Sequence, residues 1–129
     1  MVLRSDARRY EAGTHNLLGL VGLNAAMKLL LEIGIDAIAS ELLRKRALLV
    51  PAIQAKGYAV LDADVPPAHA SGIVTFFKDG ANMPALYEKL EAGGIITSLR
   101  TDRSGRQYLR LSPHFYNTDA EQRRLLELL

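Results

Sequence analysis

The chain has 129 residues, of which 49% are hydrophobic and 23% charged, with no cysteine and a formal net charge of +2 at pH 7. This length and composition are typical of one globular domain that buries about two-thirds of its unfolded surface. Without cysteine the chain has no disulfide, no thiolate metal site and no cysteine nucleophile. A charge of +2 is too small to indicate nucleic-acid binding, and no run approaches the roughly 18 apolar residues of a membrane span. We therefore expect a cytoplasmic protein with neither nucleic acid nor membrane as a partner.

The first predicted helix covers residues 17–33. Asn16 is a favourable N-cap residue, and Gly34 is a natural residue to follow a helix end. The polar side chains of this helix recur every four positions and form one narrow stripe on an otherwise apolar or small-residue surface: Asn24, Lys28 and Glu32. The pattern favours a helix that packs on most sides against another domain or subunit. The alternative is the central core helix of a compact monomer.

A second helix is predicted from about Asp36 to Lys56-Gly57. Its apolar face carries four residues at helical spacing: Ile38, Leu42, Leu49 and Ile53. Pro51 removes a backbone donor inside this pattern, so we expect a kink or a break there.

The rest of the chain alternates strands and helices. Four segments are predicted to form strands: residues 58–61, 72–77, 95–100 and 107–111. A helix after Asn82 separates the second and third of them, and Thr118-x-x-Glu121 forms a capping box for a last helix that starts at Asn117 or Thr118. Phe115 and Tyr116 are expected to anchor that helix in the core. The order α-α-β-β-α-β-β-α predicts an α+β domain, with helices covering a small mixed, largely antiparallel sheet.

Two polar segments at opposite ends of the chain carry a family resemblance. The first is Arg-Arg-Tyr-Glu-Ala-Gly-Thr-His-Asn at residues 8–16, and the second is Leu-Arg-Leu-Ser-Pro-His-Phe-Tyr-Asn-Thr at residues 109–118. Both resemble signature segments of the C-terminal small domain of class V pyridoxal 5'-phosphate (PLP) aminotransferases, a superfamily that includes cysteine desulfurases, kynureninases and isopenicillin epimerases. The resemblance covers nearly all of residues 8–129 and implies the small domain of a fold-type I PLP enzyme. It predicts an interdomain segment with a phosphate-loop-like motif at 1–16, the small domain at 17–129, and a PLP-binding large domain outside this chain.

Gly13 and Thr14 are the predicted cofactor-binding residues. They precede a helix N-terminus, where free N–H groups and the helix dipole favour an anion such as phosphate. From the residues alone, a plain helix start with Thr14 or Asn16 as its cap is the alternative. The resemblance implies that Thr14 reaches across a homodimer interface to the PLP phosphate of the other subunit. His15 departs from the family, in which proline is common at this position.

Arg110 is the predicted substrate-binding residue. It lies near the end of a predicted strand, and arginine is suited to a two-pronged grip on a carboxylate. The resemblance implies that Arg110 holds the α-carboxylate of an amino-acid substrate, with Arg100 as a second, weaker candidate. Without the resemblance, Arg110 would be an arginine solvated at a sheet edge. Arg103 and Arg106 are predicted to be charges at the tip of the hairpin.

No catalytic residue is predicted in this chain. PLP enzymes need a lysine as an imine partner, and the resemblance implies that this lysine lies upstream of the segment. Lys78 follows a strand, but its surroundings match the small-domain strand of the family instead of its lysine loop. We therefore expect the isolated chain to be inactive and not to bind PLP covalently. His114 is predicted to pack and hydrogen-bond within its turn, and no metal site is expected at His15 or His69.

The expected function is that of a C-terminal part of a PLP-dependent enzyme, supplying substrate-carboxylate and dimer-interface contacts. Cysteine desulfurases use a nucleophilic cysteine on a loop between the positions that match Arg100 and Arg110, and residues 101–109 contain none. Persulfide chemistry is therefore disfavoured, whereas transamination, racemisation or epimerisation, and β- or γ-elimination remain. One alternative is a stand-alone interaction or regulatory domain that binds a partner protein through its leucine-rich first helix. Nucleic-acid binding by the arginines of the hairpin is a third.

Overall fold

The computed structural model describes residues 4–10 and 13–129. It divides into two compact units, Met1–Ile35 and Asp36–Leu129, which we describe separately. The first unit contains the short helix η1 (Ala7–Tyr10) and the helix α1 (Leu17–Ile33). The Asn16 side chain caps α1 by accepting a hydrogen bond of 2.9 Å from the Gly19 N–H, and Gly34, with a φ of 91°, follows its end. The predicted bounds of this helix are confirmed, and none of its residues is buried.

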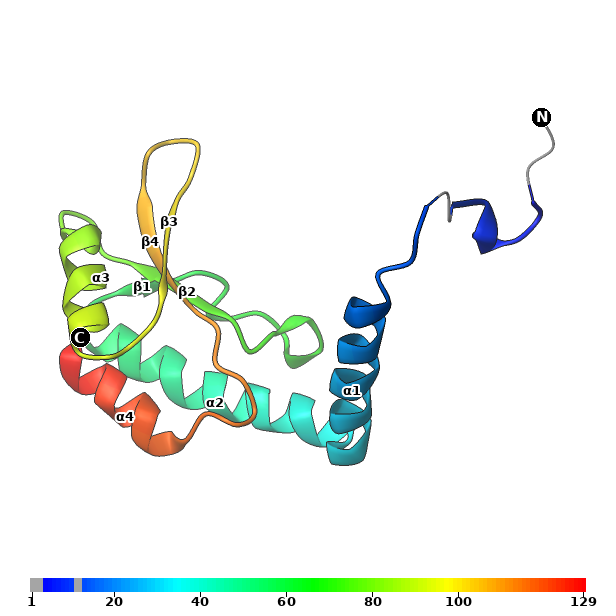
Figure 1. The fold of residues 1–129 in the computed structure, drawn as a ribbon. Helices are drawn as coiled ribbons and strands as arrows, with labels where there is room; N and C mark the ends of the chain where they lie inside the picture. The colour runs from blue at the N-terminus through cyan, green and yellow to red at the C-terminus, as the bar shows by residue number, and fades with distance from the viewer. Residues whose placement is uncertain (1–3, 11–12) are drawn as a thin grey trace. The chain divides into compact units, whose positions relative to one another are not determined.

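The second unit contains most of α2 and all later elements (Figure 1). In chain order the elements are α2 (Ile35–Ala55), β1 (Ala59–Val60), η2 (Pro67–His69), β2 (Val74–Phe77), α3 (Met83–Ala92), β3 (Ser98–Thr101), β4 (Gln107–Leu111) and α4 (Asp119–Leu128). The strands form one sheet in the order β1-β2-β4-β3. The predicted α+β class and element order are confirmed. Each of these neighbouring strand pairs is antiparallel, so the sheet has no parallel part among the described residues.

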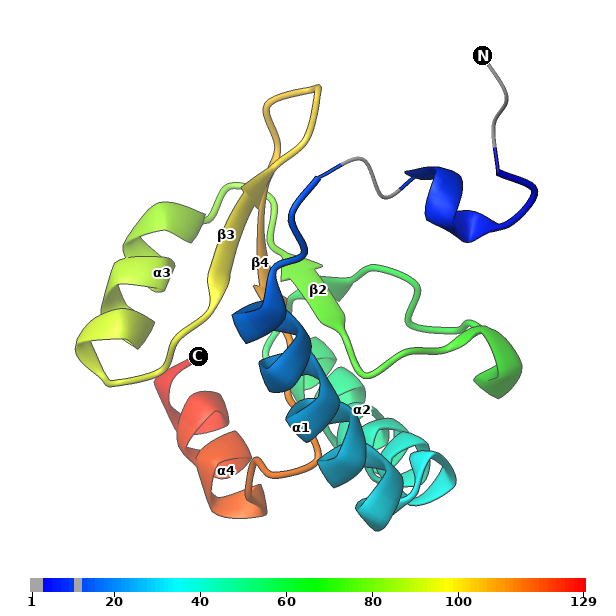
Figure 2. The same ribbon diagram turned by 45° about the vertical axis from the view of Figure 1, so that its right-hand side comes forward.

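The core lies on one face of the sheet. Val74 is opposite Leu111 and Phe76 is opposite Leu109, so alternate residues of β2 and β4 point to the same side. These side chains pack against buried residues from the three helices of this unit: Leu49, Val50 and Ile53 of α2, Met83 and Leu90 of α3, and Leu125 of α4. In both ribbon views the tip of the β3–β4 hairpin extends away from these helices (Figures 1 and 2). Among the described residues, the buried strand residues of the core all point to this one side, so the opposite face, which we call the open face, contributes none of them.

Helix α2 continues through Pro51 without a break, so a break at this position is a wrong prediction. A proline in a helix interior costs about 3 kcal/mol or more. The residues on both sides of Pro51, Leu49, Val50 and Ile53, are buried in the core. Burial of such side chains contributes roughly 1.5–3 kcal/mol each, which outweighs the local cost. The helix ends where predicted, before Gly57, which has a φ of 81°.

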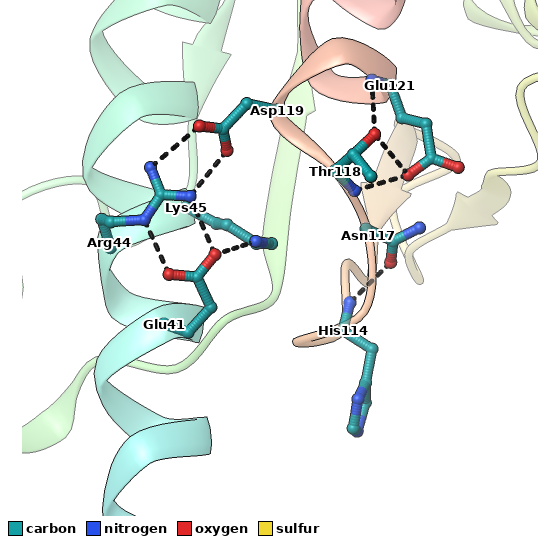
Figure 3. A network of polar contacts seen from close by, with 8 residues as sticks. All are labelled: Glu41, Arg44, Lys45, His114, Asn117, Thr118, Asp119 and Glu121. Carbon is teal, nitrogen blue, oxygen red and sulfur yellow. Dashed lines mark hydrogen bonds and ion pairs between the residues drawn. The ribbon is translucent and has the colours of Figure 1, made fainter.

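The last helix begins with the predicted capping box. The Thr118 hydroxyl accepts a hydrogen bond of 3.3 Å from the Glu121 N–H, and the Glu121 carboxylate accepts one of 2.6 Å from the Thr118 N–H (Figure 3). Phe115 is half-buried, but Tyr116 is 71% exposed. Tyr116 is therefore not a core anchor, because its ring stacks on the His114 ring outside the core.

Among the described residues, no single helix is long and apolar enough to cross a membrane. Helices α1 and α2 meet the requirement of length and composition only when they are taken together across the break at Gly34.

Candidate functional site

Both predicted substrate arginines lie on the open face of the sheet. Thr75 of β2 is directly opposite Arg110 of β4, and Ser98 of β3 is opposite Arg110 on the other side. Arg100 is opposite Tyr108, two residues along β3 from Ser98. Directly opposite residues of an antiparallel pair point to the same face, and diagonal neighbours are about 7–8 Å apart. The structure thus brings Arg100 and Arg110 together on one surface.

Arg110 carries an unpaired buried donor. Its side chain is half-buried between β2 and β3, whereas Arg100 is exposed. The Arg110 Nε atom is one of four buried side-chain polar atoms without a hydrogen-bond partner in the described part of the chain, the others being Thr97 Oγ1, His114 Nδ1 and Gln122 Nε2. A buried donor without an acceptor costs about 1–3 kcal/mol. A guanidinium grips a carboxylate through two parallel N–H groups, so an acceptor arriving at Arg110 would relieve this cost.

The side chain of Asp102 stabilises the β3–β4 hairpin, which lies beside the two arginines. Asp102 accepts hydrogen bonds from the Ser104 hydroxyl at 2.6 Å and the Tyr108 hydroxyl at 2.7 Å. These contacts lower the pKa of Asp102 to about 2, and Asp102 in turn raises the pKa of Tyr108. Arg106 lies over the Phe77 ring, 4.8 Å from its centroid, and is exposed as predicted for a hairpin charge. The carboxylate of Asp102 therefore hydrogen-bonds within the hairpin itself.

The segment after β4 is ordered by contacts around His114. Its backbone N–H donates a hydrogen bond of 2.8 Å to the Asn117 side chain (Figure 3). Its ring stacks on Tyr116, with centroids 4.9 Å apart, and meets the edge of Phe115 at 4.6 Å. These contacts agree with the packing and hydrogen-bonding role predicted for His114.

A polar network connects α2 to the start of α4 (Figure 3). Arg44 bridges Glu41 and Asp119, and the buried ammonium of Lys45 pairs with Glu41. The contacts to Arg44 and then Lys45 lower the pKa of Glu41 to about 2, and the Arg44 contact also lowers the pKa of Asp119. Lys45 is thus a buried lysine whose charge is paired with that of Glu41.

Arg46 is a buried residue that the sequence reasoning missed. Its guanidinium donates a hydrogen bond of 2.7 Å to the Ile73 carbonyl and another to the Asp62 carbonyl. It borders a cavity of about 220 Å³. Its burial could have been predicted from its position in the sequence. Arg46 follows Leu42 by four residues and precedes Leu49 by three, which places it on the apolar face of α2.

The predicted phosphate-binding residues Gly13 and Thr14 lie just ahead of helix α1. Gly13 and Thr14 are exposed, ahead of the cap residue Asn16, so Thr14 is not the N-cap of α1. A Cβ atom at Gly13 would meet nothing within 4 Å, so crowding does not require glycine there. The exposed Thr14 hydroxyl lies three residues before the α1 N-terminus, which suits a hydrogen bond to a phosphate oxygen. Glu11 and Ala12 of the same motif lie outside the described residues.

Several lysines already have contacts of other kinds. Lys45 is buried and ion-paired, and Lys89 donates a hydrogen bond of 2.6 Å to the Leu128 carbonyl. Lys78 is exposed, with its ammonium 5.5 Å from the centroid of the Tyr58 ring. Of the predicted site residues, Thr14 is exposed and Arg110 carries a buried Nε without a hydrogen-bond partner.

The model of the protein family Aminotransferase class-V matches residues 1–125. The structure is similar to that of an apo cysteine desulfurase from Thermococcus onnurineus NA1, with a TM-score of 0.86 and 20% identity over 98% of this chain and 34% of that one. It is also similar to a NifS-like protein, with a TM-score of 0.75 and 22% identity over 98% of this chain and 36% of that one. A search of the curated proteins finds no match. The chain thus spans about a third of the length of these two structures. The TM-scores show a shared fold, and at this low sequence identity they show the fold alone. Because the family match covers nearly the whole sequence, the chain belongs to the class V aminotransferase family.

Proposed function

We propose that residues 17–129 are the C-terminal small domain of a PLP-dependent enzyme that acts on an amino acid, and that residues 1–16 are the interdomain segment leading into it. The family match supports the cofactor class. The share of the solved structures that the chain covers, about a third, supports a longer enzyme with a separate large domain. A cytoplasmic location stays a prediction from the sequence.

The observation that carries this proposal is the unpaired Nε atom of Arg110 on the open face. A substrate α-carboxylate would accept hydrogen bonds from Nε and one terminal nitrogen, in the two-pronged geometry that lysine cannot offer. The opposite residues Thr75 and Ser98 are small and carry hydroxyls, which suits a polar group above Arg110. Arg100, diagonal to Arg110 and exposed, adds positive charge to the same surface.

In the proposed enzyme Thr14, beside Gly13, donates a hydrogen bond to the phosphate of PLP across a homodimer interface. Bound PLP supplies an electron sink for the bonds of the substrate α-carbon. Arg110 fixes the carboxylate of the substrate and so decides which α-carbon bond faces the cofactor. The exposed apolar residues of α1 would supply contacts to the large domain or the second subunit.

We propose a reaction other than persulfide formation. One structural neighbour is a cysteine desulfurase, but the β3–β4 hairpin of this chain has no thiol to accept sulfur. Transamination, racemisation or epimerisation, and elimination remain, because all begin with an amino acid held by its carboxylate.

The test is a side-chain NMR titration of the chain itself with glycine. Each arginine Nε–H gives its own ¹H–¹⁵N signal, so the acceptor can be located directly. We expect the Arg110 signal to shift downfield on saturation and the exposed Arg100 signal to shift less. The Arg110→Lys variant should lose most of this glycine binding, whereas Arg123→Lys, at an exposed position of α4, should keep it. Equal glycine binding by Arg110→Lys and the wild-type chain would contradict the carboxylate role.

A further inference from the structure

A small polar cavity lies on the same face of the sheet as Arg110. It has a volume of about 220 Å³ and is lined by Thr75 of β2, by residues of the segment that joins β1 to β2, and by Arg46 of α2. Leu61 continues β1, since its N–H donates a hydrogen bond of 2.8 Å to the Thr75 carbonyl. Thr75, Leu61 and Ile73 all belong to the open face by strand alternation. The cavity is therefore part of the open face, at the end of the sheet where Arg110 also lies.

Thr75 connects this cavity to Arg110. It lines the cavity and is also directly opposite Arg110 in the β2–β4 ladder. Directly opposite residues have Cβ atoms about 5 Å apart, which is close to the distance between a carboxylate and the side chain of one amino acid. Ligand pockets for whole small molecules usually measure about 300–1,000 Å³. A cavity of about 220 Å³ is suited to a part of a ligand, such as one side chain.

The lining of the cavity favours a neutral polar group. Thr75 and Ser71 bring hydroxyls, which both donate and accept hydrogen bonds. Arg46 closes the cavity with a buried positive charge whose terminal nitrogens already donate to the Ile73 and Asp62 carbonyls. The carboxylate of Asp62 disfavours an anionic ligand group, and the guanidinium of Arg46 disfavours a cationic one. The imidazole of His69 also lines the cavity and can hydrogen-bond to a neutral polar group. A hydroxyl or carboxamide meets these conditions best.

Building on the proposed function, we infer that this cavity selects the side chain of the amino-acid substrate, and that it takes a neutral hydroxyl or carboxamide group while Arg110 holds the carboxylate. Thr75 is the residue that sets this specificity. The substrate class is therefore neutral polar amino acids, in preference to aliphatic, acidic or basic ones.

The experiment compares amino acids of similar length on the chain itself by ¹H–¹⁵N NMR titration. L-Glutamine should bind at least about fivefold more tightly than L-norleucine, L-glutamate or L-lysine, with shifts in residues 61–75. The Thr75→Val variant keeps the shape of the side chain and removes its hydroxyl, so it should bring glutamine down to the affinity of norleucine. Thr101→Val, which changes an exposed threonine of β3, is the matched control and should keep the preference. Amide spectra of both variants establish that they are folded.

The outcomes separate this inference from the proposed function. Equal affinities for glutamine and norleucine, or a preference that persists in Thr75→Val, would overturn the specificity role of the cavity while glycine binding to Arg110 stands. A preference for glutamine that survives Arg110→Lys, with glycine binding also unchanged, would support the cavity and overturn the carboxylate role. Absence of binding by every amino acid would overturn both.

Discussion

Arg44 of α2 donates hydrogen bonds to both carboxylate oxygens of Asp119, at 2.6 and 3.3 Å, although the two residues are 75 positions apart in the chain. The same guanidinium also holds Glu41, one turn earlier on α2, at 2.7 Å. Since Asp119 opens α4, this arginine connects the longest helix to the helix that follows the Arg110 strand. Exposed ion pairs contribute little singly, but several charges in one network contribute more.

This network predicts acid sensitivity. The pKa of Glu41 falls from its usual 4.5 to about 2 in the folded chain, so its stabilisation is complete above pH 4.5 and is lost as the pH falls towards 2. Glu41→Gln should therefore be less stable than the wild-type chain at pH 7 and should approach it near pH 2. Urea unfolding at several pH values measures the free energy of unfolding of both chains. Glu88→Gln, which changes an exposed glutamate of α3, is the control. A difference between Glu41→Gln and wild type that is the same at pH 7 and pH 2.5 would count against the network.

The buried Arg46 predicts a stability loss of another kind. Arg46→Met keeps much of the side-chain length but leaves the Asp62 and Ile73 carbonyls without their donor. Hydrogen bonds to charged groups contribute about 1.5–3 kcal/mol, so we expect a loss in this range and faster amide exchange in residues 61–73. Arg123→Met, at an exposed position of α4, should change stability by less than about 0.5 kcal/mol. An Arg46→Met chain as stable as wild type would show that these carbonyls are satisfied by water.

The exposed apolar side chains of helix α1 lead us to expect that the chain self-associates or binds hydrophobic dyes. None of its residues is buried, and Leu18 and Leu31 are 85% and 68% exposed. Apolar patches beyond a few hundred Å² usually mark an interface. The double change Leu18→Glu with Leu31→Glu should therefore lower the sedimentation coefficient at high concentration, whereas Ile96→Glu, at a position 93% exposed elsewhere in the chain, should not. A wild-type chain that stays monomeric and binds no hydrophobic dye would contradict this reading.

The chain should not attach PLP covalently at one lysine. Lys45 is ion-paired with Glu41, Lys89 donates a hydrogen bond to a backbone carbonyl, and exposed Lys78 lies over the Tyr58 ring. Incubation with PLP, borohydride reduction and peptide mapping should give only scattered, substoichiometric labelling. Stoichiometric and selective labelling of one residue, such as Lys78, would contradict the placement of the catalytic lysine outside this segment.

Local signals predicted most of the fold. The caps at Asn16, Asn82 and Thr118 set the starts of α1, α3 and α4, because each side chain satisfies a helix N–H within three residues. Pro51 was harder to predict, since its cost is local and its compensation comes from burial against distant strands. The burial of Lys45 and Arg46 was missed, although Glu41 precedes Lys45 by one helical turn and Arg46 lies on the apolar face of α2. The carbonyl partners of Arg46 are defined only in the folded chain. The shared face of Arg100 and Arg110 and the cavity beside Thr75 were not predicted, because both depend on how the strands pair in the folded chain.

The central claim is that Arg110 holds the substrate carboxylate while Thr14 contacts the cofactor. In the proposed longer enzyme loaded with PLP, a spectrophotometric titration with amino acid separates the two roles. Arg110→Lys should keep PLP but lose about 3 kcal/mol of carboxylate binding, which lowers affinity and catalytic efficiency by roughly two orders of magnitude. Thr14→Ala should instead release PLP more readily, with a smaller change in amino-acid affinity. If Arg110→Lys binds the amino acid as tightly as the parent, or loses PLP instead, Arg110 has a structural role and the assignment is wrong.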